Sequence, residues 1–145
     1  MATVRDIMNP KVVGIRPEAT LAEAVAILTQ QHIGGAPVVT PEGKVIGVIS
    51  ELALIDVVFD SDAKDALVSD YMTPEVHTVH PDDPLSRPAQ LFALYSFRRL
   101  PVVENGKLVG IVTRRDLMNY ALRSNALLTD PLIELIPSLA PMTVS

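Results

Sequence analysis

The sequence predicts an α/β (α+β) fold in which two tandem repeats each have the order strand, helix, strand, strand, helix. The first observation behind this prediction is an internal duplication, because the segment 4–58 recurs at 68–122. Adding 64 to the residue number aligns the first part of the two copies, and adding 63 aligns the rest after one residue is lost in a turn. The second observation is size, since 145 residues at 48% hydrophobic content suit one compact domain. Each half alone would bury too little surface, so the two halves are expected to share a core.

The first copy opens with a strand and a capped helix. Val12–Ile15 is a short β-branched run ended by Arg-Pro, which is typical of a strand. Thr20, followed three residues later by Glu23, is typical of a helix N-cap. The pair Gly34–Gly35 is predicted to end this helix. The helix should bury the apolar residues that fall on one of its faces, which are Leu21, Ala24, Val25 and Leu28.

A hairpin and a second helix complete the first copy. One strand is predicted to begin at Pro37, the chain turns at 41–43, and a second strand follows over 44–50. The apolar run of the second strand suggests burial on both faces. Ser50 is predicted to cap a helix that runs from 51 to about 59.

The second copy follows a polar connection at 60–65 and departs from the first copy in its first helix. Pro84 can occupy the first turn of a helix, but Pro88 lacks an amide hydrogen and would crowd the carbonyl of Pro84. The helix is therefore predicted to begin near Arg87 or to bend there. Its buried side is predicted to contain Leu91, Phe92, Leu94 and Tyr95.

Composition and charge exclude several classes of protein. The chain has no cysteine, so it can form no disulfide, no thiolate nucleophile and no Cys-ligated zinc site. No stretch approaches the roughly 20 apolar residues of a membrane span, and the N-terminus lacks the order of a signal peptide, so no membrane insertion and a cytoplasmic location are expected. A net charge of -5 without a long basic run predicts no nucleic-acid partner. It leaves room for one small anionic ligand in a local positive pocket.

Short motifs in both copies carry a family resemblance. Each copy has Asp-x-Met-x-Pro, a short valine run before a proline, a helix, Pro-Val-Val, and Gly-Lys-x-x-Gly-x-x-[Ser/Thr] before a last helix. This order resembles the CBS motif, and two copies in tandem resemble a CBS domain pair, or Bateman module, over residues 4–122. The resemblance implies two β-α-β-β-α units packed through their sheets by pseudo-twofold symmetry. It also implies two clefts between the repeats, which often bind AMP, ADP, ATP or S-adenosylmethionine, and assembly into a homodimer.

The resemblance divides the chain into a first CBS repeat at 1–60, a second at 61–124 and a C-terminal tail at 125–145. The tail contains an apolar stretch bounded by prolines. Two interpretations stay open: the tail docks on the domain or on a partner, or it is a frayed end.

The second repeat has the residue types that an adenosine ligand needs. A ribose presents two neighbouring hydroxyls that a carboxylate can accept from, and phosphates favour amides, hydroxyls and cations at a helix start. By its match to the family's Thr-x-x-Asp, Asp116 would bind the ribose, with Thr113 at the start of the last helix. Gly110 would let the backbone come close to the ligand. Arg114 would lie beside the helix start, where a phosphate is favoured.

Other residues join this predicted site through the resemblance. They are the stretch before and within the Pro-Val-Val strand, which commonly borders the nucleotide, and two residues across the cleft: Arg98, Arg99, Leu100, Pro101, Val12 and Val13. Purely structural explanations stay open beside these assignments. Thr113 and Asp116 have the spacing of a helix capping box, the arginines could form a solvated surface, and the glycines and prolines could serve turns and close strand packing.

The equivalent site of the first repeat is predicted to be weak. It would use Ser50, Ala36, Pro37 and His77, but Ala53 stands where the second repeat has Asp116. Loss of a hydrogen bond to a charged group costs about 1.5–3 kcal/mol, and the first repeat also lacks the arginines. We therefore predict one competent ligand site and not two.

Two histidines are candidates for a metal site. If Val76 to Val79 is a strand, His77 and His80 point to opposite faces, so one metal ion could not easily take both. We predict no metal site and no required cofactor.

No catalytic motif supports an enzyme, because the chain has no Gly-x-Ser-x-Gly, P-loop or His-Glu-x-x-His pattern. The leading hypothesis is a sensor that binds an adenosine-containing ligand and signals to a partner protein of unknown identity. The alternative is a ligand-free interaction or dimerisation module with the same fold. A regulatory fragment of a larger enzyme or channel is a third possibility.

Overall fold

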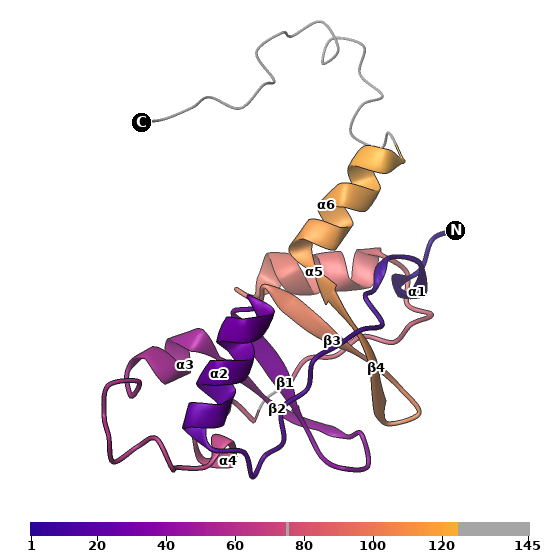
Figure 1. The fold of residues 1–145 in the computed structure, drawn as a ribbon. Coiled ribbons are helices and arrows are strands. Elements are labelled where there is room, and N and C mark those ends of the chain that lie inside the picture. The colour runs from indigo at the N-terminus through magenta and orange to yellow at the C-terminus, as the bar shows by residue number, and fades with distance from the viewer. Residues whose placement is uncertain (75, 125–145) are drawn as a thin grey trace, which may run out of the picture.

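The computed structural model describes residues 1–74 and 76–124, so the predicted tail lies outside the described residues. Two antiparallel hairpins lie in the middle of the molecule, with helices around them (Figure 1). The elements are α1 (Val4–Ile7), α2 (Leu21–Gln31), β1 (Gly35–Val39), β2 (Val45–Ser50), α3 (Glu51–Ile55), α4 (Val68–Tyr71), α5 (Ser86–Leu94), β3 (Arg99–Glu104), β4 (Lys107–Thr113) and α6 (Arg114–Arg123). The mixed helix and sheet fold with two small antiparallel sheets is confirmed.

The predicted strand at Val12–Ile15 is much shorter than expected. Ile15 forms one parallel bridge to Val38, and Val79 forms the equivalent bridge in the second repeat. The Ile15 amide donates to the Pro37 carbonyl at 2.9 Å, and the Ile15 carbonyl accepts from the Val39 amide at 2.8 Å. Pro17 follows two residues later and has no amide to continue a ladder. The run therefore adds a single bridging residue to the sheet.

The helices of the first repeat begin as predicted and end earlier. The Thr20 hydroxyl accepts from the Glu23 amide at 3.1 Å, which caps α2. The predicted end at Gly34–Gly35 is wrong, because His32 closes the helix in the left-handed conformation at φ 55°. Ser50 caps α3 through the Ala53 amide as predicted, but α3 ends at Ile55 and not near residue 59.

The first helix of the second repeat accommodates its two prolines by starting late. α5 begins at Ser86, which agrees with the predicted start near Arg87. Pro88 lies in the first turn, where the amide has no partner within the helix, so its missing hydrogen costs no helical bond. Of the predicted buried side, Leu91 is buried and Phe92 is partly buried. Leu94 and Tyr95 are 75% and 44% exposed, because the helix ends there, so that part of the prediction is wrong.

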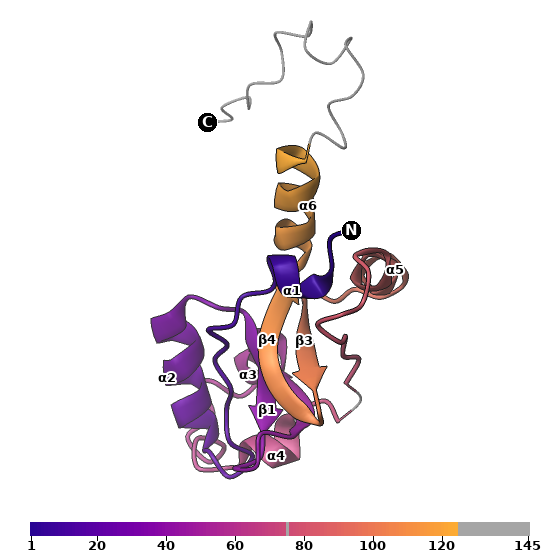
Figure 2. The same ribbon diagram turned by 90° about the vertical axis from the view of Figure 1, so that its right-hand side faces the viewer.

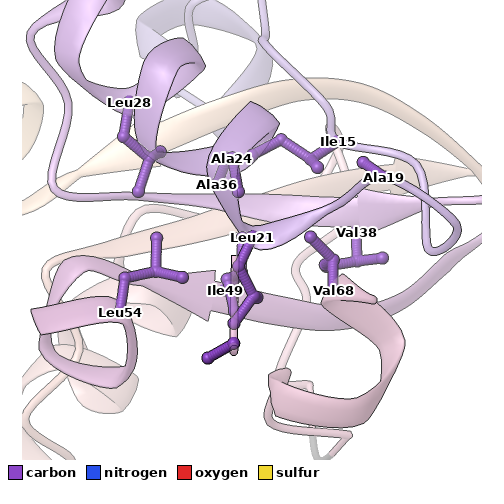
Figure 3. Packing of buried hydrophobic residues seen from close by; sticks show 11 residues of the cluster. Ile15, Ala19, Leu21, Ala24, Leu28, Ala36, Val38, Ile49, Leu54 and Val68 are labelled. Atoms are coloured by element: carbon purple, nitrogen blue, oxygen red, sulfur yellow. The ribbon is translucent and has the colours of Figure 1, made fainter. Parts of the chain in front are cut away.

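The core consists of two hydrophobic clusters, one for each hairpin. Figure 3 shows the first, in which α2 packs its apolar face on the inner face of β1 and β2. The buried members of the first cluster are Ile15, Ala19, Leu21, Ala24, Leu28, Ala36, Val38, Ile49, Leu54, Ala63 and Val68. Those of the second are Val4, Val79, Leu91, Leu100, Val102 and Val112.

Each cluster takes a short helix from the other repeat. Val4 of α1 is buried in the second cluster, and its amide donates to the Asp83 carbonyl at 3.0 Å. Val68 of α4 is buried in the first cluster, and its amide donates to the Ala19 carbonyl at 2.8 Å. In Figures 1 and 2, α1 accordingly lies beside α5 and the base of α6, and α4 lies below α2. This exchange ties the two halves together through both cores.

The methionine of each repeat packs against the motif glycine of the other repeat. A Cβ on Gly110 would lie 2.8 Å from Sδ of Met8 and 3.2 Å from the Asn9 carbonyl oxygen. A Cβ on Gly47 would lie 2.5 Å from Sδ of Met72. Asn9 also bridges to the edge of β4. The glycines therefore leave room for the methionine segment of the other repeat.

Candidate functional site

Two clefts lie at the junction of the repeats, and each takes residues from both. The first, here called the Asp116 cleft, has a volume of about 210 Å³. The start of α6 forms one wall with Thr113 and Asp116, and the first repeat supplies the opposite wall. That opposite wall consists of Asn9, Lys11, Val12, Val13, Ile33, Gly35 and Pro37, and Arg99 and Ile111 complete the lining.

The second cleft, here called the Ser50 cleft, has a volume of about 300 Å³. The start of α3 contributes Ser50 and Glu51 to it. The second repeat contributes an aromatic and cationic wall, formed by Val76, His77, Phe97, Arg98, Arg99, Leu100 and Pro101. The two clefts are thus built to one plan, in which the helix start of one repeat faces the strand start of the other.

Asp116 has its carboxylate fixed by the cap of its own helix. The Thr113 hydroxyl accepts from the Asp116 amide at 3.1 Å, and Oδ2 of Asp116 accepts from the Thr113 amide at 2.8 Å. This is the capping box that the sequence left open as a structural explanation. Among the hydrogen bonds of the described residues, Oδ1 of Asp116 takes no part, although the residue lines the cleft. Capping and ligand binding are therefore compatible at this residue.

The structure divides the predicted Asp116 site between the two clefts. Val12, Val13 and Arg99 join Thr113 and Asp116 as predicted. The other residues before and within β3 do not, because they lie in the Ser50 cleft: Arg98, Leu100 and Pro101. Residues that are close to Thr113 in sheet register are therefore separated from it by the way the repeats face one another.

Several predicted residues contribute to packing. Gly110 is buried under Met8 and lines neither cleft, and Arg114 is exposed and lines neither. Leu100 is 1% exposed, because alternation along β3 turns its side chain into the second cluster. In the predicted weak site, Ala36 is wholly buried in the first cluster, and Pro37 lies in the Asp116 cleft. Ser50 and His77 do share a cleft.

Sequence reasoning missed three residues that contribute charge or shape. Lys11 lies in the Asp116 cleft directly before Val12, and Glu51 and Phe97 lie in the Ser50 cleft. The ring of Phe97 is 5.2 Å from that of His77, and Tyr95 packs on both rings at 4.6–5.0 Å between centroids. The position of Phe97 directly before Arg98 was the available signal for this aromatic wall.

His77 and His80 lie in different environments. His77 belongs to the aromatic wall, whereas Nδ1 of His80 accepts from the Asp82 amide at 3.0 Å. Within the described part of the chain, His80, Asp82 and Glu104 are close enough to share a metal ion. The Arg5 guanidinium already bonds to Asp82 at 3.2 Å and to Glu104 at 3.0 Å, and these carboxylates raise the pKa of Arg5. That exposed group is therefore an ion-pair network in this structure.

Arg99 is half-buried between the two clefts. Burial lowers the pKa of Arg99 and the neighbouring Arg98 lowers it further, whereas Glu51 raises it. Arginine remains protonated at neutral pH despite such shifts. Arg99 is thus a fixed positive charge at the boundary of both clefts.

No helix among the described residues is long and apolar enough to cross a membrane.

Comparison with known proteins gives a family match to both repeats. The family model of the CBS domain matches residues 4–60 and 68–123. The CBS domain-containing protein YhcV of Bacillus subtilis is 34% identical over 119 residues, which cover 81% of this chain and 84% of YhcV. The uncharacterized protein MJ1225 of Methanocaldococcus jannaschii is 35% identical over 115 residues, and the A-adding tRNA nucleotidyltransferase of Aquifex aeolicus is 32% identical over 115. Each of these two matches covers 79% of this chain, but only 41% and 14% of the relative.

Two solved CBS-pair structures contain adenosine compounds. CBSX2, a CBS-pair protein from Arabidopsis thaliana, has been solved in complex with AMP. It is 31% identical with a TM-score of 0.78, and the match covers 86% of this chain and 99% of CBSX2. The CBS domain pair of protein MJ0100, in complex with 5-methylthioadenosine and S-adenosyl-L-methionine, is 26% identical with a TM-score of 0.74. That match covers 86% of this chain and 98% of the other.

Proposed function

Because the chain belongs to the CBS-domain family, we propose that it is a regulatory module that binds an adenosine-containing ligand in the Asp116 cleft. The CBS pair itself is not an enzyme. The observation that carries the proposal is the carboxylate of Asp116, which its helix cap fixes at the cleft while Oδ1 stays free to accept. The AMP complex of CBSX2 and the S-adenosyl-L-methionine complex of the MJ0100 pair support this ligand class.

The lining of the Asp116 cleft suits each part of such a ligand. Oδ1 of Asp116 would accept hydrogen bonds from the ribose hydroxyls. A phosphate would lie near the positive end of α6 and the side chains of Lys11 and Arg99. The adenine would pack on the apolar opposite wall, which contains Val12, Val13, Ile33 and Pro37.

Signalling would follow from the position of the ligand between the repeats. A ligand held by both walls changes the relative stability of arrangements in which those walls lie closer or further apart. The size of that shift is limited by the difference in ligand affinity between the two arrangements. A regulated protein, of unknown identity, would respond to the change.

Titration calorimetry with AMP, ADP, ATP and S-adenosylmethionine tests the proposal. We expect at least one of these ligands to bind with a stoichiometry near one per chain, because Ala53 of the first repeat stands where the second repeat has Asp116. Two equivalent nucleotides per chain would contradict a single competent site. No binding by any of the four would overturn the proposal and favour the ligand-free interaction module.

We also propose that the chain forms a homodimer through the outer faces of α3 and α6. No residue of α6 is buried, and Met118 and Leu122 are 58% and 53% exposed. Leu52 and Ile55 of the equivalent helix α3 are 77% and 65% exposed. Apolar side chains gathered on two related helices are a surface that a second copy would cover.

Analytical ultracentrifugation checks the dimer. We expect the chain to sediment as a dimer and Met118→Glu to shift it toward monomer, because a charge would be buried at the interface. Leu94→Glu is the matched control, since Leu94 is 75% exposed on α5, outside the proposed surface. An unchanged dimer in Met118→Glu, or an equal effect of both substitutions, would contradict this surface.

A further inference from the structure

Arg99 lies on the ridge that separates the two clefts. The ridge is the backbone of Gly34, which lines the Ser50 cleft, and Gly35, which lines the Asp116 cleft. A Cβ on Gly35 would lie 2.6 Å from Nη1 of Arg99, and one on Gly34 would lie 3.4 Å from Nη2. The two nitrogens of one guanidinium therefore cover the two glycines, and Arg99 lines both clefts.

The charges of the two clefts make this position important. In the Asp116 cleft, Lys11 and Asp116 offset one another. In the Ser50 cleft, Arg98 and Glu51 offset one another in the same way. Arg99 is the remaining charged residue in both linings, with histidine taken as neutral. The lining of each cleft thus has a net positive charge only when the charge of Arg99 is assigned to that cleft.

We propose that Arg99 is a shared anion-binding residue, so that a phosphate bound in one cleft takes the cation that the other cleft needs. A phosphorylated ligand in the Asp116 cleft and an anion in the weaker Ser50 cleft would then bind with negative coupling, whereas a ligand without phosphate would not show this coupling. This inference rests on the proposed function, because it concerns the same Asp116 cleft.

The chemistry of the guanidinium supports sharing. Its planar fork donates two parallel hydrogen bonds to one phosphate, and donors that are aligned on one anion cannot also be aligned on a second in another cleft. Glu51 supplies the competing attraction, since its Oε1 would lie 3.1 Å from a Cβ on Gly34 and its charge raises the pKa of Arg99. Glu51 therefore attracts the guanidinium from the Ser50 side of the ridge, while Nη1 lies over Gly35 on the Asp116 side.

A double-mutant cycle measured by AMP titration tests the sharing. Of the two clefts, Glu51 lines the Ser50 cleft and not the Asp116 cleft, so Glu51→Gln should release Arg99 toward the Asp116 cleft and tighten AMP there by about fivefold or more. Arg99→Gln should weaken AMP by roughly ten- to a hundredfold. In the Arg99→Gln background, Glu51→Gln should change AMP affinity by less than about twofold, which is the part due to relief of long-range repulsion between Glu51 and the phosphate.

Adenosine, which has no phosphate, is the control ligand. Glu51→Gln should change its affinity by less than about twofold, and retained adenosine binding by Arg99→Gln would show that the cleft is still folded. An equal effect of Glu51→Gln on AMP with and without Arg99 would overturn the sharing while leaving the proposed function intact. If neither AMP nor adenosine bound to the unsubstituted chain or to any variant, both the sharing and the proposed function would be overturned.

Discussion

Replacing Asp116 with alanine is expected to weaken AMP binding by roughly ten- to a hundredfold, which is the loss of a hydrogen bond to a charged group. The expected loss follows from geometry: Oδ2 accepts from the Thr113 amide at 2.8 Å, which fixes the carboxylate of a residue that lines the cleft. Titration calorimetry of AMP against both chains measures the change.

The control must separate binding from helix capping, because Asp116→Ala also removes the capping bond to the Thr113 amide. Thr20→Ala removes a different bond of a helix cap, at α2, where the Thr20 hydroxyl accepts from the Glu23 amide at 3.1 Å, and Thr20 lines neither cleft. Both substitutions should cost about 0.5–2 kcal/mol of stability. Only Asp116→Ala should weaken AMP, and a similar affinity loss in Thr20→Ala would mean that Asp116 acts through stability alone.

Leu100→Ala is expected to lower the free energy of unfolding by about 2–5 kcal/mol, the usual cost of removing a large buried side chain. Leu100 is 1% exposed and packs in the second cluster with Val79, Leu91 and Val112. The surrounding strands hold this site from several sides, so the cavity would not close completely. Urea unfolding followed by circular dichroism gives the change.

Leu94→Ala is the matched control for Leu100→Ala, because the same chemical change is made where the side chain is 75% exposed. It should alter stability by less than about 0.5 kcal/mol. Equal costs at the two positions would contradict the assignment of Leu100 to the core. That outcome would also restore the prediction that Leu94 lies on the buried side of its helix.

The local pattern was sufficient for most element starts. Thr20, Ser50 and Thr113 each accept from the amide three residues on, so short-range hydrogen bonding fixed where α2, α3 and α6 begin. Helix ends were harder to predict. The glycine pair two residues later was predicted to end α2, but His32 adopts the left-handed conformation and ends it first. The spacing of Leu94 and Tyr95 in the sequence fits the buried face of a helix, but α5 ends at Leu94.

The grouping of site residues was the part that local pattern could not supply. The resemblance to the CBS motif placed the whole stretch 98–101 beside Asp116, and Arg99 does pair with Thr113 in the β3–β4 register. In the structure, Arg99 alone of that stretch lines the Asp116 cleft. The other three residues lie in the Ser50 cleft, beside the start of α3. The opposite wall of each cleft comes from residues of the other repeat, whose approach depends on how the repeats pack.

Sequence alone is sufficient for the duplication, the order of elements and the helix caps, and its resemblance to the CBS motif identifies Asp116 as the candidate ribose-binding residue. The order of elements and the caps follow from contacts between residues a few positions apart, which composition and spacing record directly. Tertiary packing is what exchanges α1 and α4 between the cores, divides the predicted site into two clefts and puts Arg99 on the ridge between them. Those features arise from packing between distant segments, and the sequence carries no local signal for which segments will meet.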